Sequence, residues 1–305
     1  MPTSLPKATI TFPMLGDWFK ITTAPAFELF GLTIHWYGVI MAVGFLLAIW
    51  YASKNCKYFG LKFDTIIDLL LWAVPFAIIG GRIYFVIFQF DQYRDNLWDV
   101  FKVWEGGIAF YGVLIGAIIT TVVFCLKRNI KIGAVLDFIV PGFLIAQAVG
   151  RWGNFINREA FGVQTDIFCR MGLIVPGGEA IFVHPAFLYE SFWNALGLIL
   201  ISIFLKKGRR KYDGQVFAMY LVWYGFARLM IESLRTDSLY LFNTGIRASQ
   251  LIGALCIAGS IIYLAINGSI SHDRSELYVN TNSGRERSEA ETEAGELVSE
   301  NRDEE

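Results

Sequence analysis

The sequence predicts an all-α polytopic membrane protein with seven transmembrane helices, an outside N-terminus and a cytoplasmic C-terminus. Of its 305 residues, 55% are hydrophobic and only 17% are charged, whereas a soluble domain carries about a quarter charged residues. Seven apolar stretches are each long enough, at about 20 residues, to cross the hydrocarbon core of a bilayer. The loops between them alternate in charge, and this alternation sets the orientation.

Each of the seven stretches is a run of apolar residues that ends at a charged or glycine-rich connection. They lie at 36–53, 65–88, 108–126, 132–150, 185–205, 214–233 and 248–267. Runs of this length are typical of helices that cross a membrane, because a helix satisfies its own backbone hydrogen bonds in lipid. Together they predict one helical membrane domain over residues 35–270.

Basic residues gather in the loops that follow the first, third and fifth stretches. These three loops contain eleven of them, namely Lys54, Lys57, Lys62, Lys127, Arg128, Lys131, Lys206, Lys207, Arg209, Arg210 and Lys211. The loop at 89–107 has only two basic residues against four acidic ones. Because short loops rich in Lys and Arg stay in the cytoplasm, we expect the three basic loops to be cytoplasmic and the loop at 89–107 to lie outside.

Three segments outside the helical stretches have compositions of their own. Residues 1–34 contain four prolines and are expected to lie along the outer surface, and the loop at 163–183 is expected to form an outer cap. Residues 271–305 hold 4 basic and 11 acidic residues, a net charge of −7. A segment so charged and so poor in apolar residues is predicted to be a disordered cytoplasmic tail.

The segment at 150–162, GRWGNFINREAFG, directly follows the fourth stretch and carries the strongest functional signal. It contains two arginines, two asparagines, one glutamate and three glycines. Charge at a membrane boundary is costly unless it is paired or meets an anion, so such a cluster indicates a functional site. A helix cap would explain one of the asparagines and leaves the rest of the cluster unexplained.

Arginines also lie inside two other stretches. Arg82 is in the second, and Arg228 is in the sixth, where it shares one helix face with Tyr224 and Glu232 at spacings of four residues. If Arg82, Arg151 and Arg228 face one chamber, they repel one another unless an anion lies between them. A lipid phosphate fits, because a guanidinium binds phosphate oxygens in bidentate geometry. The alternative is that each arginine pairs with a glutamate only to lock helices together.

Five blocks between about residues 27 and 267 resemble the prolipoprotein diacylglyceryl transferase family. They are Trp36-Tyr37-Gly38, Gly81-Arg82-xx-Phe85, Trp104-Glu105-Gly106-Gly107, the segment 150–162 and Tyr224-xxx-Arg228-xxx-Glu232. The fourth block is the specific one. The resemblance implies a seven-span, outward-facing helical protein, which agrees with the topology predicted from composition and charge.

The resemblance also implies an activity, the transfer of a diacylglyceryl group from phosphatidylglycerol to the lipobox cysteine of a prolipoprotein in the bacterial inner membrane. It implies no metal, no cofactor and no nucleic-acid partner. The residues expected to be catalytic are Arg151, Arg228, Asn154, Glu159, Tyr37 and Tyr111. The residues expected to bind phosphatidylglycerol are Arg151, Asn154, Asn157, Gly162, Arg82, Tyr224 and Arg228.

The chain departs from the family shortly after Gly106-Gly107. Many members carry a histidine there that has been proposed as a general base, and this chain has Tyr111. A tyrosine with a pKa of about 10 is a poor base at neutral pH. Either the arginines lower the pKa of Tyr111, or no side chain acts as the base. The second reading is adequate if a positive field lowers the pKa of the acceptor thiol, which is ordinarily about 8.5.

Two other classes of protein stay open on the sequence alone. A carrier or channel for an anionic solute would place its site at the membrane midplane between two related halves, whereas this polar cluster is expected at the outer boundary. A purely structural membrane subunit would leave the convergence of arginines without a cause.

Overall fold

The computed structural model describes residues 5, 7–16, 18–94, 96–236, 245 and 247–281. The chain forms two compact units. Unit 1 comprises Met1–Ser53, Phe138–Lys211 and Gln215–His272, and unit 2 comprises Lys54–Asp137, Tyr212–Gly214 and Asp273–Glu305. Each unit is described by itself below.

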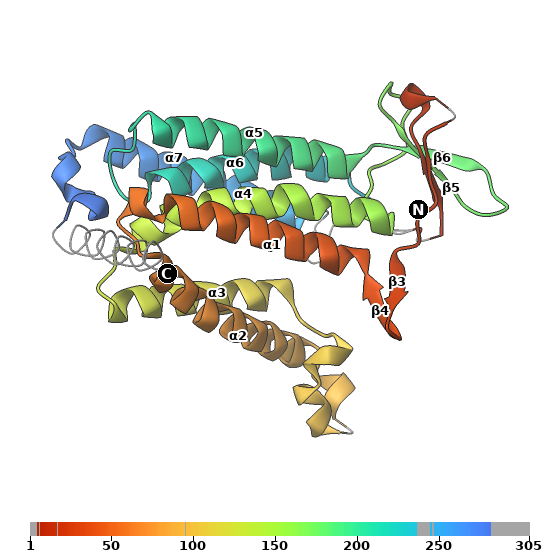
Figure 1. Cartoon of the computed structure of the whole chain (residues 1–305), viewed down its shortest axis with the longest axis horizontal. Helices are drawn as coiled ribbons and strands as arrows, with labels where there is room; N and C mark the ends of the chain where they lie inside the picture. The colour runs from red at the N-terminus through yellow and green to blue at the C-terminus, as the bar shows by residue number, and fades with distance from the viewer. Residues whose placement is uncertain are drawn as a thin grey trace, which may run out of the picture. The chain divides into compact units, whose positions relative to one another are not determined.

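All seven expected stretches are α-helical (Figure 1). The helices are α1 Trp36–Asn55, α2 Phe63–Phe88, α3 Phe110–Lys127, α4 Ile132–Asn157, α5 Ala186–Lys206, α6 Gln215–Ile231 and α7 Ala248–Ser269. Six of them are long and apolar enough to cross a membrane, and α6, with 17 residues, is the shortest. The protein is therefore a mostly helical, multi-pass membrane protein.

Helix α4 is longer than its apolar run, because it continues through the first eight residues of the 150–162 segment to Asn157. The expected end at residue 150 was wrong because hydropathy does not register a polar helical turn. The helix ends where the chain turns left-handed at Arg158, with φ of 52°. There the Arg158 N–H donates to the Phe155 carbonyl and the Glu159 N–H donates to the Asn154 carbonyl, which is the pattern of a Schellman cap.

Six short strands were not anticipated from the sequence. Four form an antiparallel sheet in the order β2-β1-β5-β6, with bounds β1 Thr9–Thr11, β2 Lys20–Ile21, β5 Met171–Ile174 and β6 Ala180–Val183. The other two, β3 Ala26–Leu29 and β4 Leu32–His35, form a hairpin that leads directly into α1 (Figure 1). Strands β1 and β5 join the N-terminal segment to the 163–183 loop, since Ile10 pairs with Leu173. Both side chains are buried in a core with Phe155 of α4 and Phe187 of α5.

The boundary predicted for the disordered tail, residue 271, lies too early in the chain. Residues 274–276 and 278–280 form short 3-10 turns in unit 2, and the side chains of Leu277 and Tyr278 are buried. The Tyr278 N–H donates to Asp213 Oδ2 at 2.9 Å, and the Lys131 ammonium donates to the Glu276 carbonyl. These contacts have no sequence periodicity, so composition could not reveal them. The remainder of the predicted tail, 282–305, lies outside the described residues.

Ending the chain after His272 is therefore expected to destabilise the protein, while ending it after Thr281 is not. Only the first truncation removes the burial of Leu277 and Tyr278, which stabilises by about 1.5–3 kcal/mol for each side chain. The thermal unfolding midpoint of the purified protein in detergent measures the difference. Equal midpoints for the two truncated proteins would show that the 273–281 contacts contribute nothing.

Candidate functional site

The polar residues of the 150–162 segment form a connected chain of hydrogen bonds at the end of α4. Arg151 Nη1 donates to Asn154 Oδ1 at 3.3 Å, and Asn154 Nδ2 donates to Glu159 Oε1 at 3.0 Å. Asn157 Nδ2 donates to the same carboxylate oxygen at 3.2 Å. The Schellman cap brings Glu159 back over the last helical turn, so the two amides can orient its carboxylate, and Asn154 in turn orients Arg151.

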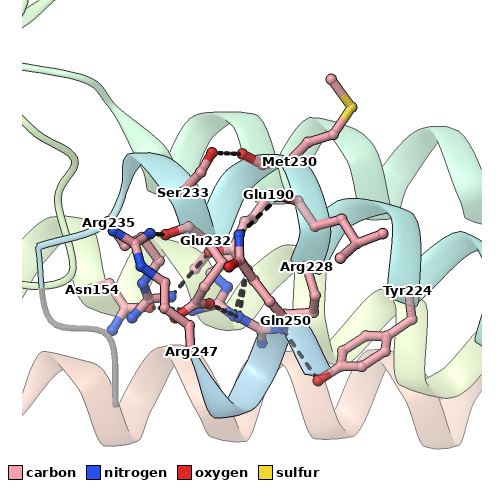
Figure 2. A network of polar contacts seen from close by, with 12 residues as sticks. Asn154, Glu190, Tyr224, Arg228, Met230, Glu232, Ser233, Arg235, Arg247 and Gln250 are labelled. Carbon is pink, nitrogen blue, oxygen red and sulfur yellow. Dashed lines mark hydrogen bonds and ion pairs between the residues drawn. The ribbon is translucent and has the colours of Figure 1, made fainter. Parts of the chain in front are cut away.

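On its other side, Arg151 meets a glutamate that sequence reasoning left out of the site. Glu190 of α5 accepts from Arg151 Nη2 at 2.6 Å through Oε2 and from Arg235 Nη1 at 3.1 Å through Oε1. Arg228 Nη1 lies 3.9 Å from Oε2. Figure 2 shows Arg228 and Arg235 converging on this carboxylate. Glu190 had no partner visible in sequence, because its partners lie on α4, on α6 and just after α6.

The expected shared face of α6 is present. Arg228 Nε donates to the Tyr224 hydroxyl at 3.1 Å, and its Nη1 donates to Glu232 Oε2 at 3.3 Å (Figure 2). The Arg228 guanidinium also lies over the Tyr224 ring, 5.2 Å from the centroid. The main-chain carbonyl of Glu232 accepts from Arg247, which stands at the start of α7. The i, i+4 spacing read from the sequence therefore aligns one arginine between an aromatic hydroxyl and a carboxylate.

Arginines outnumber glutamates among the residues of this cluster that the structure describes. Four arginines, Arg151, Arg228, Arg235 and Arg247, surround two glutamates, Glu190 and Glu232, and the described members are largely shielded from solvent. Like charges at such distances repel strongly where the dielectric constant is low. Arg151 and Arg228 share the Glu190 carboxylate, so their guanidinium groups make the cluster suited to bind an anion with several oxygen acceptors. We name these six residues the arginine cluster.

Two glycines place neighbouring elements against the site. A side chain at Gly153 would meet the Tyr37 ring at 2.6 Å, so the absence of a Cβ lets Tyr37 of α1 lie flat on α4. A side chain at Gly162 would meet His184 at 2.6 Å, and Gly162 forms a β-bridge with Arg235. Gly162 thus supports Arg235 by close backbone approach, while its expected contact with phosphatidylglycerol stays a prediction. Burial lowers the pKa of His184 and so favours its neutral form, and Nδ1 lies 3.3 Å from the Tyr189 hydroxyl.

Arg82 does not have the role expected for it. Its five N–H groups point at five main-chain carbonyls of the loop between α2 and α3, those of Asp99, Val100, Lys102, Gly106 and Gly107. A guanidinium has five N–H donors, so none remains for a phosphate. We therefore withdraw Arg82 from the phosphatidylglycerol site. The sequence could not separate the two roles, because a buried arginine satisfied by carbonyls and one satisfied by phosphate look alike in one dimension.

The remaining candidate, Tyr111, is the second residue of α3 in unit 2, where its ring packs edge-on against Phe110. The other expected residues, apart from Arg82, belong to unit 1. The structure thus brings together Tyr37, Arg151, Asn154, Asn157, Glu159, Tyr224 and Arg228 within one unit. A catalytic role of Tyr111 stays a prediction.

Arg158 points away from the arginine cluster and is fully buried. Its Nε donates to the Ala8 carbonyl at 2.9 Å, its Nη1 donates to the Ile156 carbonyl, and its own carbonyl accepts from the Leu5 N–H at 2.9 Å. The residue therefore ties the N-terminal segment to the end of α4.

Replacing Arg158 with alanine is expected to lower the thermal unfolding midpoint without changing the rate per folded molecule. The substitution removes a buried charged donor and leaves carbonyls unsatisfied, which costs about 1–3 kcal/mol for each group. Thermal unfolding together with activity normalised to folded protein separates the two effects. An unchanged midpoint with lost activity would instead place Arg158 in the chemistry.

The chain is similar to known proteins over most of its length. The family model described as prolipoprotein diacylglyceryl transferase matches residues 24–266. A Finegoldia magna protein named phosphatidylglycerol–prolipoprotein diacylglyceryl transferase is 42% identical over 240 residues, 78% of this chain and 94% of its own. Proteins of the same name from Listeria welshimeri and Enterococcus faecalis are 41% and 40% identical, over 82% and 79% of this chain and 92% and 89% of theirs. The chain therefore belongs to the prolipoprotein diacylglyceryl transferase family.

Proposed function

We propose that this protein transfers the diacylglyceryl group of phosphatidylglycerol to the lipobox cysteine of prolipoproteins, the first step of lipoprotein maturation. Family membership and the names of the relatives support the reaction and both substrates. The observation that carries the proposal at the level of residues is the arginine cluster, in which Arg151 and Arg228 share the Glu190 carboxylate. A phospholipid phosphate offers further oxygen acceptors to the same two guanidinium groups.

In the proposed reaction the cysteine sulfur attacks the glycerol carbon that carries the phosphate ester. A C–S bond forms, the C–O bond breaks, its electron pair leaves with glycerol phosphate, and the thiol proton is released. Arg151 and Arg228 hold the phosphate and stabilise the charge that grows on the leaving oxygen, a contribution that is commonly the largest in catalysis. Their positive field also favours the thiolate of the acceptor, so the reaction does not depend on Tyr111 as a base.

The other residues of the site position these two arginines. Glu190 and Glu232 fix the guanidinium planes of Arg151 and Arg228 by ion pairs of 2.6 Å and 3.3 Å. Asn154 holds Arg151 from the opposite side. Alignment of this kind supplies a substantial part of the rate of group transfer. Tyr37, Tyr224 and Asn157 are proposed to complete the polar wall that faces the lipid headgroup.

The proposed topology has seven spans, an outside N-terminus and an active site that faces outward from the inner membrane. Helix α6 and the 3-10 turn Glu232–Leu234 together run from residue 215 to 234, which is about the 20 residues that a span needs. The eleven basic residues in three loops support the orientation.

A cysteine placed at Gly177 should react with an impermeant reagent in intact cells, and a reporter after Glu305 should be cytoplasmic. Labelling at Gly177 only after permeabilisation would invert this topology.

The reaction is tested with purified protein, labelled phosphatidylglycerol and a lipobox peptide. We expect a peptide that has gained a diacylglyceryl thioether, together with released glycerol phosphate, both identified by mass spectrometry. A peptide with serine in place of the cysteine is the matched control and should stay unmodified. Folded protein that forms no thioether, but moves an anionic solute across vesicles, would favour a carrier instead.

A further inference from the structure

The loop between α2 and α3 presents an exposed aromatic surface in unit 2 (the gold segment in Figure 1). It contains two 3-10 turns, Leu97–Phe101 and Val103–Glu105. Leu97, Trp98, Phe101 and Trp104 are 61%, 76%, 67% and 76% exposed. We call these four residues the aromatic platform. Large apolar side chains gathered in this way indicate an interaction surface.

Arg82 holds the backbone that carries the platform. Arg82 is only 7% exposed, and its guanidinium lies 5.1 Å from the centroid of the Tyr93 ring and donates to carbonyls spread from Asp99 to Gly107. The Ala109 N–H donates in turn to the Gly81 carbonyl at 3.1 Å, which joins the end of the loop to α2 beside Arg82. One side chain therefore gathers both turns of the loop around itself, and the platform is preformed.

Two ion pairs form within the described part of this loop. Lys102 pairs with Asp99 at 2.7 Å, and Arg94 pairs with Asp91 at 2.9 Å. The Asn96 side chain accepts from the Trp98 N–H at 3.2 Å and so caps the first turn. These polar groups are therefore satisfied within the loop, and the four apolar side chains beside them are exposed.

The platform continues the lipid-facing surface of the two helices that flank it. Both α2 and α3 are long and apolar enough to cross a membrane. Ile83, Ile87 and Phe88 at the end of α2, and Phe110 at the start of α3, are exposed in the same way as the platform. Helix α2 ends at Phe88 and α3 begins at Phe110, so the loop connects the adjacent ends of two candidate spans.

We propose that the aromatic platform is seated in the headgroup region of the bilayer and that Arg82 is the positioning residue that maintains its shape. Tryptophan prefers this depth because its ring is apolar while its N–H needs a polar partner. This inference rests on the membrane helices and does not depend on the proposed reaction.

The depth of Trp98 and Trp104 in the bilayer is measured by tryptophan fluorescence in vesicles that contain brominated lipids. The emission of Trp98 and Trp104 is obtained by subtracting the spectrum of the Trp98→Phe, Trp104→Phe double variant from that of the unaltered protein. Trp72, which is exposed near the middle of α2, is the matched deep control and is obtained from Trp72→Phe. We expect bromine near the ester end of the acyl chains to quench Trp98 and Trp104 more than bromine near the methyl end, and the opposite order for Trp72.

Two results would overturn the seating of the platform. Trp98 and Trp104 could escape quenching by both lipids, which would place them in water or in a protein contact, or they could follow the same order as Trp72.

The role of Arg82 as the positioning residue is tested with Arg82→Lys, whose three donors cannot reach five carbonyls. We expect the Trp98 and Trp104 emission to shift to longer wavelength and to lose its preference for shallow bromine, while the Trp72 signal stays the same and reports an intact fold. An unchanged platform signal in Arg82→Lys would show that Arg82 does not shape the loop.

Discussion

Replacing Arg151 with lysine is expected to lower the rate of diacylglyceryl transfer a few hundredfold while the protein remains folded. Lysine keeps the charge but loses the planar fork that can contact a phosphate and Glu190 at the same time. Loss of one oriented donor at a site of developing charge costs about 3–4 kcal/mol of activation free energy. The rate is measured with saturating lipopeptide acceptor and phosphatidylglycerol in mixed micelles, and thermal unfolding is measured on the same preparation.

The matched control for this variant is Arg94→Lys. Arg94 makes an exposed ion pair with Asp91, and an exposed pair contributes only about 0–1 kcal/mol, so the same chemical change should leave activity near its original value. Asn154→Ala and Glu159→Gln should also lower the rate, because they release Arg151 from its hydrogen-bond chain. A transfer rate for Arg151→Lys close to that of Arg94→Lys would remove Arg151 from the phosphate site.

The Glu190→Gln variant is expected to lose both activity and stability. The Glu190 carboxylate lies between Arg151 and Arg235 and faces Arg228, so the neutral amide leaves three guanidinium groups without their shared counter-charge. Removing one partner of a buried ion pair costs about 3–5 kcal/mol. We expect the transfer rate to fall at least as far as in Arg151→Lys and the thermal unfolding midpoint to drop as well.

Added phosphate tests whether excess positive charge causes the loss of stability in Glu190→Gln. If excess positive charge is the cause, inorganic phosphate or phosphatidylglycerol should raise the unfolding midpoint of Glu190→Gln more than that of the unaltered protein, because a ligand that binds the folded state stabilises it. Glu179→Gln, at an exposed turn of unit 1, is the matched control and should respond like the unaltered protein. Full activity in Glu190→Gln would mean that the cluster tolerates one less negative charge and that Glu190 has no part in the site.

The helices and much of the site could be predicted because their signals are local. Hydropathy located all seven helices to within a few residues at most ends, and the spacing of Tyr224, Arg228 and Glu232 correctly placed them on one face. The polar segment at 150–162 was recognisable because charged residues beside an apolar run are rarely accidental. Each of these inferences uses a helical period or a composition that a single segment carries by itself.

The roles of individual charges could not be read in the same way. Arg82 and Arg151 are both arginines in apolar helices next to glycines, yet one donates to five carbonyls and the other meets Glu190. Glu190 looked like an ordinary polar residue of α5 because its partners are contributed by distant parts of the chain. The β1–β5 pairing was invisible for the same reason, since its two strands are about 160 residues apart and only three to four residues long.

By itself the sequence determined which segments are helical, which family the chain resembles, and where polar groups interrupt apolar surface. Those properties depend on side-chain hydropathy and on periods of a few residues, which are present before folding. The tertiary structure decided which acid each arginine meets, how the N-terminal strand and the 171–183 strands form one sheet, and that residues 274–280 are ordered. These outcomes depend on contacts between residues far apart in the chain, where the free energy of a charge is set by what folding places beside it.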